Sequence, residues 1–349
     1  METYPQLRSS VAPCDTTFGI EEEIFITEPT RPALSALYVM AKLLWRNPRD
    51  YYKRSATNFA RGKDARQCLM SSVEIATRPH RDSESLMLDL LARRRDLAQA
   101  AGQAYLVPVG HLFDIESPTN TGGLHLHIGV APERRASVYA NLAHFLPLLM
   151  LLSASSPYAG GRYFGQSYRM AHSFAIGALR DDPYYRFQDL IISRRLGTIE
   201  IRAFDPIWDT ERLRWLLRAV NAIVALSDAR PLDFARYALL REQAACAGYT
   251  PELRRLYAEL REIVDLPEVL LQRTLSDELA DCTAREGLLP TYARLNRAYR
   301  TGRWAPTAPH PVKPSAGRAL LGLAGYYLPK LPYIAYKAWA EWRLAPYDA

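Results

Sequence analysis

Three consecutive glutamates stand inside a segment that otherwise has the composition of a β-strand, and this feature restricts the possible folds most strongly. The segment is TFGIEEEIFIT, residues 17–27. Because side chains alternate between the two faces of a strand, Glu21 and Glu23 share one face and Glu22 lies on the other. A buried carboxylate pays a desolvation penalty of several kcal/mol. The face with Glu21 and Glu23 must therefore be an exposed edge or a surface that receives a cation.

Three further strand-like segments carry polar side chains at the same period: GGLHLHIGV with His125 and His127, VEIAT with Glu74, and GTIEIRAFD with Glu200 and Arg202. Carboxylate oxygens suit Mg²⁺ or Mn²⁺, whereas the two histidines with nearby carboxylates would also suit Zn²⁺. The alternatives are solvent-exposed glutamates, structural histidines and a plain salt bridge between Glu200 and Arg202. Four such strands together predict one acidic cleft that holds two or more divalent ions.

Strands and helices are mixed over the first two-thirds of the chain, and helices dominate the last third. Strands are expected at 18–26, 68–77, 104–110, 122–130 and 197–205, and helices at 34–45, 83–103, 132–153, 211–227, 251–264 and 290–300. The strands do not alternate regularly with helices, which argues against a doubly wound parallel sheet. The pattern predicts an α+β fold with a mostly antiparallel sheet.

The composition is that of a basic globular protein, with a formal net charge of +7 and 48% hydrophobic residues. Arginine clusters at 93–95, 194–195 and 254–255 are expected on solvated helix faces, with an anionic substrate such as a nucleotide as the alternative. No nucleic-acid-binding motif occurs, so no nucleic-acid partner is expected. The four cysteines have neither zinc-site nor disulfide spacing, which favours reduced thiols in the cytoplasm.

Neither a secretory signal nor a membrane span is expected, because the chain has no apolar signal core and no uninterrupted apolar run of the required length. The apolar segment from Ala316 to Leu344 is interrupted by Pro329 and Pro332. We expect a helix–break–helix tail that packs on the body of the protein. A membrane or partner surface is the alternative.

Taken in order, FGIEEE, VEIAT, GGLHLHIG, SASSP with the later SYR, and TIEIRAFD resemble the glutamate–cysteine ligase type 2 family. These are bacterial carboxylate–amine ligases related to glutamine synthetase. The resemblance spans residues 17–226. It implies a glutamine synthetase-like fold, in which a curved, mostly antiparallel sheet forms an active-site funnel flanked by helices. It also implies a single ligase domain over 17–300, after an extension at 1–16 and before a Pro/Gly-rich connection and helical tail at 301–349.

The resemblance also implies site residues. The metal ligands would be Glu21, Glu23, Glu74, His125 and Glu200. Arg202 is similar to the arginine that faces the ATP phosphates, so Glu200 and Arg202 would be the catalytic pair. Arg169 and Ser156 would contact the nucleotide or substrate.

One position departs from the family pattern. The family usually has a glutamate seven residues before the one that matches Glu74, and Gln67 stands there in this chain. The amide oxygen of Gln67 can still coordinate a metal, but it brings no negative charge. We expect a weaker metal site there, or a substrate that supplies the missing charge.

The implied cofactors are ATP and Mg²⁺ or Mn²⁺, and the implied substrates are a small carboxylic acid and an amine, in a cytoplasmic protein that forms a homodimer. The carboxylate would attack the γ-phosphorus of ATP to give an acyl phosphate and ADP, and the amine would displace phosphate to form an amide. Glutamate is the default acid by resemblance, and the departure at Gln67 favours another acid or amine in specialised metabolism. A non-catalytic nucleotide-binding relative and a zinc hydrolase are the alternatives.

Overall fold

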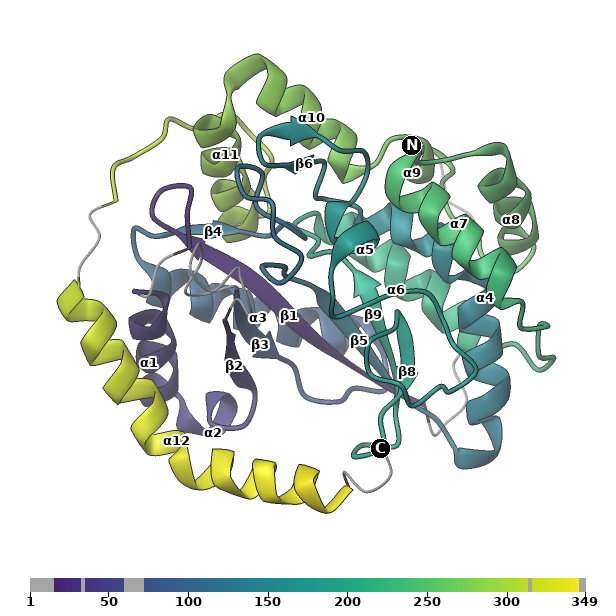
Figure 1. Cartoon of the computed structure of the whole chain (residues 1–349), viewed down its shortest axis with the longest axis horizontal. Helices are drawn as coiled ribbons and strands as arrows, with labels where there is room; N and C mark the ends of the chain where they lie inside the picture. Colours follow the sequence, from purple (N-terminus) through teal and green to yellow (C-terminus); the bar gives the residue numbers. More distant parts are fainter. Residues whose placement is uncertain (1–15, 33–34, 60–71, 313–315, 345–349) are drawn as a thin grey trace, which may run out of the picture.

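The computed structural model describes residues 16–32, 35–59, 72–312 and 316–344 of the chain (Figure 1). The strands are β1 (Thr17–Thr27), β2 (Ser55–Asn58), β3 (Ser72–Ala76), β4 (Tyr105–Val107), β5 (Leu124–Gly129), β6 (Tyr158–Ala159), β7 (Arg162–Tyr163), β8 (Leu190–Ile192) and β9 (Ile199–Phe204). The first helices are α1 (Ala36–Arg46), α2 (Pro48–Tyr51), α3 (Ser83–Ala101), the 3₁₀ helix η2 (Pro132–Arg134), α4 (Arg135–Ser153) and α5 (Tyr168–His172). The later helices are α6 (Thr210–Val224), α7 (Phe234–Cys246), α8 (Pro251–Arg261), α9 (Val269–Gln272), α10 (Leu275–Glu286), α11 (Leu288–Thr301) and α12 (Ala316–Leu344).

The main sheet is antiparallel throughout and has β1 near its centre. Its strand order is β2-β3-β1-β5-β9-β8, and β4 pairs with the last residues of β1. The remaining two strands, β6 and β7, form a separate hairpin. The sheet and the helical last third confirm the predicted α+β class.

The two faces of the sheet have opposite character, as the alternation in β1 predicts. Ile20, Glu22 and Ile24 are completely or almost completely buried on one face. Helix α3 packs on this face against β1 and β3, and Figure 1 shows it behind these strands. The neighbours Glu21 and Glu23 are only partly buried on the opposite face.

Helix α4 forms the centre of the second half of the molecule, where it packs against α6, α7, α8 and β9. Nearly all of its side chains from Val138 to Ser153 are buried. Among the described residues, Pro132–Ser153 is the segment long and apolar enough to cross a membrane, and most of its apolar stretch lies inside the protein. Core packing therefore accounts for its composition.

The prediction of solvated arginines at 93–95 is wrong for two of the three residues. Arg93 and Arg94 are buried, because each forms ion pairs with acidic residues inside the protein. Arg93 pairs with Asp50 and Asp89, and Arg94 pairs with Glu22. The arginines at 194–195 and 254–255 are exposed, as expected.

The predicted break in the tail is also wrong, although its packing on the body is confirmed. Helix α12 runs without interruption through Pro329 and Pro332 and packs against α1. A proline removes one helical hydrogen bond and bends a helix. Figure 1 shows α12 changing direction at the lower left of the molecule.

Candidate functional site

One face of the sheet brings together most of the predicted metal ligands, and strand register does this directly. The β1–β3 register places Glu23 opposite Glu74, and the β1–β5 register places Glu21 opposite His125. Opposed residues of antiparallel strands lie on the same face with Cβ atoms about 5 Å apart. Gln67, the remaining predicted ligand, lies outside the described residues.

The face continues onto β9, where Glu200 lies opposite His127 of β5. The His125 Nδ1 atom is 3.6 Å from Glu200 Oε1 and 3.8 Å from Glu21 Oε2. The His127 Nε2 atom is 3.4 Å from Glu21 Oε2. The alternation in LHLHIG placed His127 on this face, but the family motif gave it no role. The structure adds it to the site.

The electrostatics of this face show an excess of negative charge. Burial and then the neighbouring Glu21 and Glu23 carboxylates raise the pKa of Glu74 well above its ordinary value. Burial would also raise the pKa of Glu21, but His125 and His127 outweigh it and hold this pKa well below its usual range. The face thus mixes an ionised carboxylate with one that resists ionisation. Either a proton or a cation must compensate the charge.

The candidate metal ligands are of the chemical type that a hard divalent cation prefers, although their atoms do not converge on one point. Carboxylate oxygens from β1, β3 and β9 are the ligands that Mg²⁺ prefers. Within the part of the chain that the structure describes, no three His, Cys, Asp or Glu side chains stand close enough to hold a metal ion. Asn58 of β2 donates a 2.8 Å hydrogen bond to Glu23 Oε1, which orients that carboxylate. Metal binding would require a third donor to turn toward an existing pair.

Arg202 and Glu200 lie on the same side of β9, as their spacing predicts. Arg202 Nε is 3.3 Å from Glu200 Oε1, so the simple salt bridge is present. Arg202 also donates to the backbone carbonyl of Arg186, and its side chain is almost buried. The guanidinium of Arg202 therefore places a positive charge beside the acidic face.

Arg169 and Ser156 direct their hydrogen bonds into the protein. The Arg169 guanidinium donates to the backbone carbonyls of Arg202, Ala203 and Phe204. The Ser156 hydroxyl donates to Asp205 Oδ2 at 2.9 Å. Both side chains are buried, and their contact with a nucleotide stays a prediction.

Gly123 at the start of β5 permits this arrangement. A Cβ atom there would stand 2.2 Å from the Arg169 guanidinium and 3.1 Å from His125 Nε2. The glycine therefore allows Arg169 to approach the edge of the acidic face, where a side chain at position 123 would clash with the guanidinium.

Glu22 lies in the core and has no place on the acidic face, which confirms that it points away from Glu21 and Glu23. Its carboxylate is completely buried and forms an ion pair with Arg94 of α3. Arg94 Nε donates to Glu22 Oε2 at 3.0 Å, and the Tyr299 hydroxyl of α11 donates to the same oxygen at 3.0 Å.

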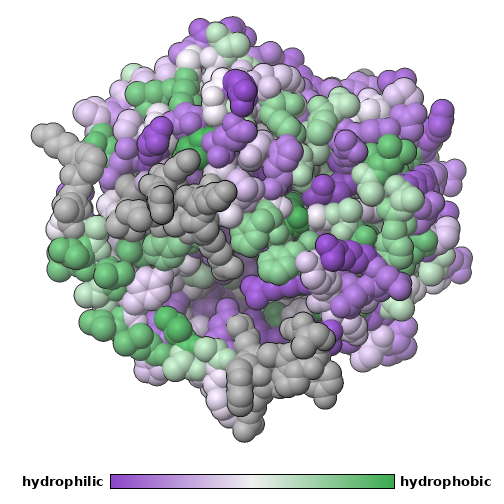
Figure 2. Space-filling model, viewed as in Figure 1, coloured by the Kyte–Doolittle hydropathy of each residue, from purple (hydrophilic) through white to green (hydrophobic). Residues whose placement is uncertain are grey.

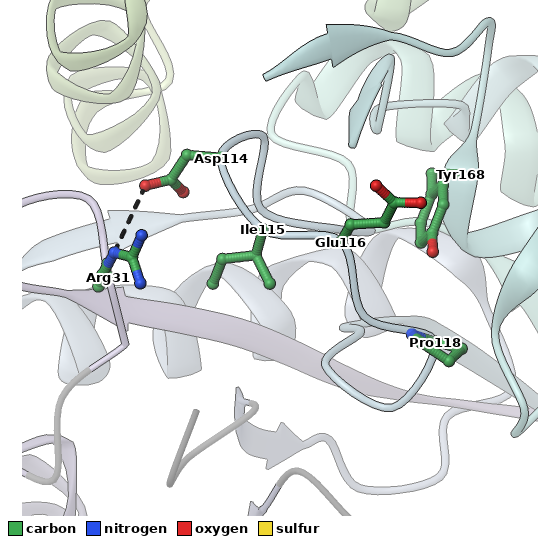
Figure 3. A pocket seen from close by; sticks show the side chains of 6 residues that line it. All are labelled: Arg31, Asp114, Ile115, Glu116, Pro118 and Tyr168. Atoms are coloured by element: carbon green, nitrogen blue, oxygen red, sulfur yellow. Dashed lines mark ion pairs between the residues drawn. The ribbon is translucent and has the colours of Figure 1, made fainter. Parts of the chain in front are cut away.

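A separate pocket of about 420 Å³ is lined by Arg31, Asp114, Ile115, Glu116, Pro118 and Tyr168 (Figure 3). Arg31 and Asp114 stand on one side, 3.8 Å apart, and Glu116 and Tyr168 stand on the other. None of the predicted metal ligands that the structure describes lines this pocket, so the acidic face and the pocket are distinct features.

The antiparallel sheet with its flanking helices defines the class of the protein by its fold, which is glutamine synthetase-like. A crystal structure of a glutamate–cysteine ligase from Francisella tularensis in complex with AMP is similar with a TM-score of 0.59 and 12% identity, over 93% of this chain and 95% of that one. A bifunctional glutathione synthetase from Pasteurella multocida gives a TM-score of 0.58 and 12% identity, over 82% of this chain and 52% of that one. At this identity the likeness shows the fold alone.

In sequence, the chain is a relative of proteins named "Putative glutamate–cysteine ligase 2", which confirms the resemblance seen in its motifs. The relatives include one from Bradyrhizobium sp. BTAi1, 28% identical over 47% of this chain and 45% of its own length. Another, from Pseudomonas aeruginosa, is 33% identical over 36% of this chain and 43% of its own length. These matches thus span less than half of those relatives. A relative named "Putative glutamate–cysteine ligase 2-1" from Streptomyces avermitilis is 26% identical over 76% of this chain and 86% of its own length. No family model matches the sequence.

Proposed function

We propose that this protein is an ATP-dependent carboxylate–amine ligase, which joins a glutamate-type acid to an amino acid or small amine through an acyl phosphate. The acidic face carries the proposal, since the paired strands oppose Glu23 to Glu74, Glu21 to His125 and His127 to Glu200. Its setting in a fold similar to glutamate–cysteine ligase supports the same reaction class.

The proposed roles follow from charge and position. Glu21, Glu23, Glu74 and Glu200 with His125 would hold Mg²⁺ or Mn²⁺, which when bound neutralises the phosphates of ATP. Arg202 would face the transferring phosphoryl group, where its guanidinium stabilises developing negative charge. For this it would exchange its contact with Glu200 for a phosphate oxygen, a partner that suits the planar guanidinium equally well.

The departure at Gln67 favours an acid or amine other than the usual pair, in specialised metabolism. The single domain over 17–300, the homodimer and the cytoplasmic location are implied by the family resemblance and stay predictions.

The test is ADP release and hydroxamate formation with a panel of carboxylic acids, hydroxylamine and Mg-ATP. Glu23→Gln and Glu200→Gln should each lower the rate at least about a hundredfold, because each removes one charge from the metal-binding face. Glu262→Gln is the matched control, since Glu262 is exposed on the surface after α8.

Two results would replace the proposal. Tight binding of Mg-ATP without ADP release for any acid, also after Gln67→Glu, would indicate a non-catalytic nucleotide-binding relative. Tightly held zinc in the purified protein would favour a hydrolase built on His125 and His127, both of which stand near Glu21.

A further inference from the structure

An ordinary surface helix buries its apolar side. In helix α12 the polar side faces the body of the protein and the apolar side faces solvent. The Tyr326 hydroxyl donates to the Ser55 carbonyl at 2.9 Å, and Lys330 donates to the Tyr326 hydroxyl at 2.8 Å. Gly322 lies directly against the backbone of α1 at Leu37 and Tyr38. Residues 322, 326 and 330 follow one another at intervals of one helical turn, which fixes the inner side of α12.

The opposite side of α12 is the outward face, which we define by six large apolar residues: Leu320, Leu321, Leu328, Leu331, Ile334 and Trp339. Their exposed fractions range from 39% to 69%. Trp45 of α1, 68% exposed, extends this face and donates a hydrogen bond to the Gly325 carbonyl. Figure 2 shows hydrophobic residues along the lower left margin, where α12 runs. Several large apolar side chains exposed on one side of a helix mark an interaction site.

A group of positive charges borders the outward face. Lys42 and Arg46 line a pocket of about 360 Å³ together with Trp45 and Gln99. Lys42 and Arg46 stand one helical turn apart on α1, and burial and then the positive charges of Arg46 and Arg318 lower the pKa of Lys42. The sequence from Gly302 to Ala340 contains no Asp or Glu.

We propose that the outward face of α12 binds the surface of an anionic lipid bilayer, with its leucines and Trp339 in the acyl boundary and Lys42, Arg46 and Arg318 at the head groups. A basic rim beside an apolar helical face, with tryptophan at its margin, is the composition of an interfacial helix. A second copy of this chain would bring the same positive rim, and the two rims would repel each other. Anionic head groups carry the charge opposite to that of the rim and attract it.

The experiment is sedimentation of the full chain with vesicles that contain phosphatidylglycerol, and with vesicles of phosphatidylcholine alone. The protein should bind the former and remain in solution with the latter, and high salt should weaken binding. Arg46→Gln with Arg318→Gln should lower the partition coefficient roughly 25-fold, about fivefold for each basic residue lost. Arg255→Gln with Arg285→Gln removes the same charge from exposed positions on α8 and α10 and should change it less than about twofold.

The apolar contribution has its own variant. Leu328→Glu with Leu331→Glu should reduce binding at least about tenfold, because two charges enter the acyl boundary. Leu239→Glu is the control, since Leu239 is 53% exposed on α7. Circular dichroism melts should be unchanged for all variants, as each altered side chain is exposed.

Three results would overturn the inference. The first is that neither vesicle binds, and the second is equal binding to both vesicles. The third is a concentration-dependent dimer that Leu328→Glu with Leu331→Glu abolishes while vesicles have no effect, which would assign the face to a second copy.

Discussion

Substitution of two adjacent glutamates in β1 should give opposite results, and this follows from the side of the sheet on which each lies. Glu22→Gln removes the charge that compensates the buried guanidinium of Arg94. Breaking a buried ion pair at one partner costs about 3 to 5 kcal/mol of unfolding free energy. For 349 residues, an unfolding entropy of roughly 2.1 cal/mol/K per residue gives about 0.7 kcal/mol/K. Glu22→Gln should therefore lower the melting temperature by about 4 to 7 °C.

Glu23→Gln should leave the melting temperature within about 1 °C of the parent protein. Its amide oxygen can still accept from Asn58, and the change removes one of the carboxylates that raise the pKa of Glu74. The same substitution should lower ligase activity at least about a hundredfold if the proposed function is correct. The substitution at position 22 should thus change stability, and the substitution at position 23 should change activity.

The assay is differential scanning calorimetry of both single variants and a triple variant. Glu22→Leu with Arg94→Met and Tyr299→Phe replaces the buried charges and the hydroxyl that donates to Glu22 by apolar groups. It should recover most of the lost stability, because a buried ion pair is often no better than a packed apolar core. Two results would contradict the assignment of Glu22 and Glu23 to opposite faces. One is a Glu22→Gln melting temperature within about 1 °C of the parent protein, and the other is a decrease in melting temperature for Glu23→Gln as large as that for Glu22→Gln.

Two further predictions concern pH. Burial raises the pKa of Asp50, but ion pairs with Arg93 and Arg78 hold it well below its ordinary value. The resulting stability is present above the unfolded pKa of about 3.9 and is lost as pH falls through the folded pKa. Asp50→Asn should lower the unfolding free energy at pH 7 by about 2 kcal/mol and by much less at pH 2, measured by urea unfolding. Burial lowers the pKa of Lys330 to about 8. The folded state then binds fewer protons than the unfolded state between about pH 8 and pH 10, so Lys330 should make stability rise with pH in this window. Lys330→Met should abolish that contribution, and an unchanged pH profile would contradict it.

Much of the sheet could be predicted because its signals are local. The period-2 pattern in TFGIEEEIFIT, LHLHIG and IEIRAF located β1, β5 and β9 and the facing of their polar side chains. The short strand β8 was missed because it carries too few residues for a period to be recognised. The continuity of α12 was also missed, since Pro329 and Pro332 are strong local breakers. Its anchoring by Tyr326 and Lys330 on β2 is a long-range contact.

In the candidate site, too, local features could be predicted and long-range contacts could not. The sequence predicted which glutamates share a face, whereas only the strand register shows that Glu74 opposes Glu23 and that His127 opposes Glu200. The arginines at 93–95 were assigned to a solvated face because a charge run contains no information about partners elsewhere in the chain.

The opposite facing of Glu22 and its two neighbours, Glu21 and Glu23, follows from the local pattern, because the alternation of a strand depends on neighbouring residues alone. The role of Glu22, by contrast, depends on long-range packing. Its partners Arg94 and Tyr299 are 72 and 277 residues away, and the packing of α3 and α11 against β1 brings them to it. A buried charge is stable only with such partners, and their identity is fixed by the packing of distant elements rather than by any local pattern.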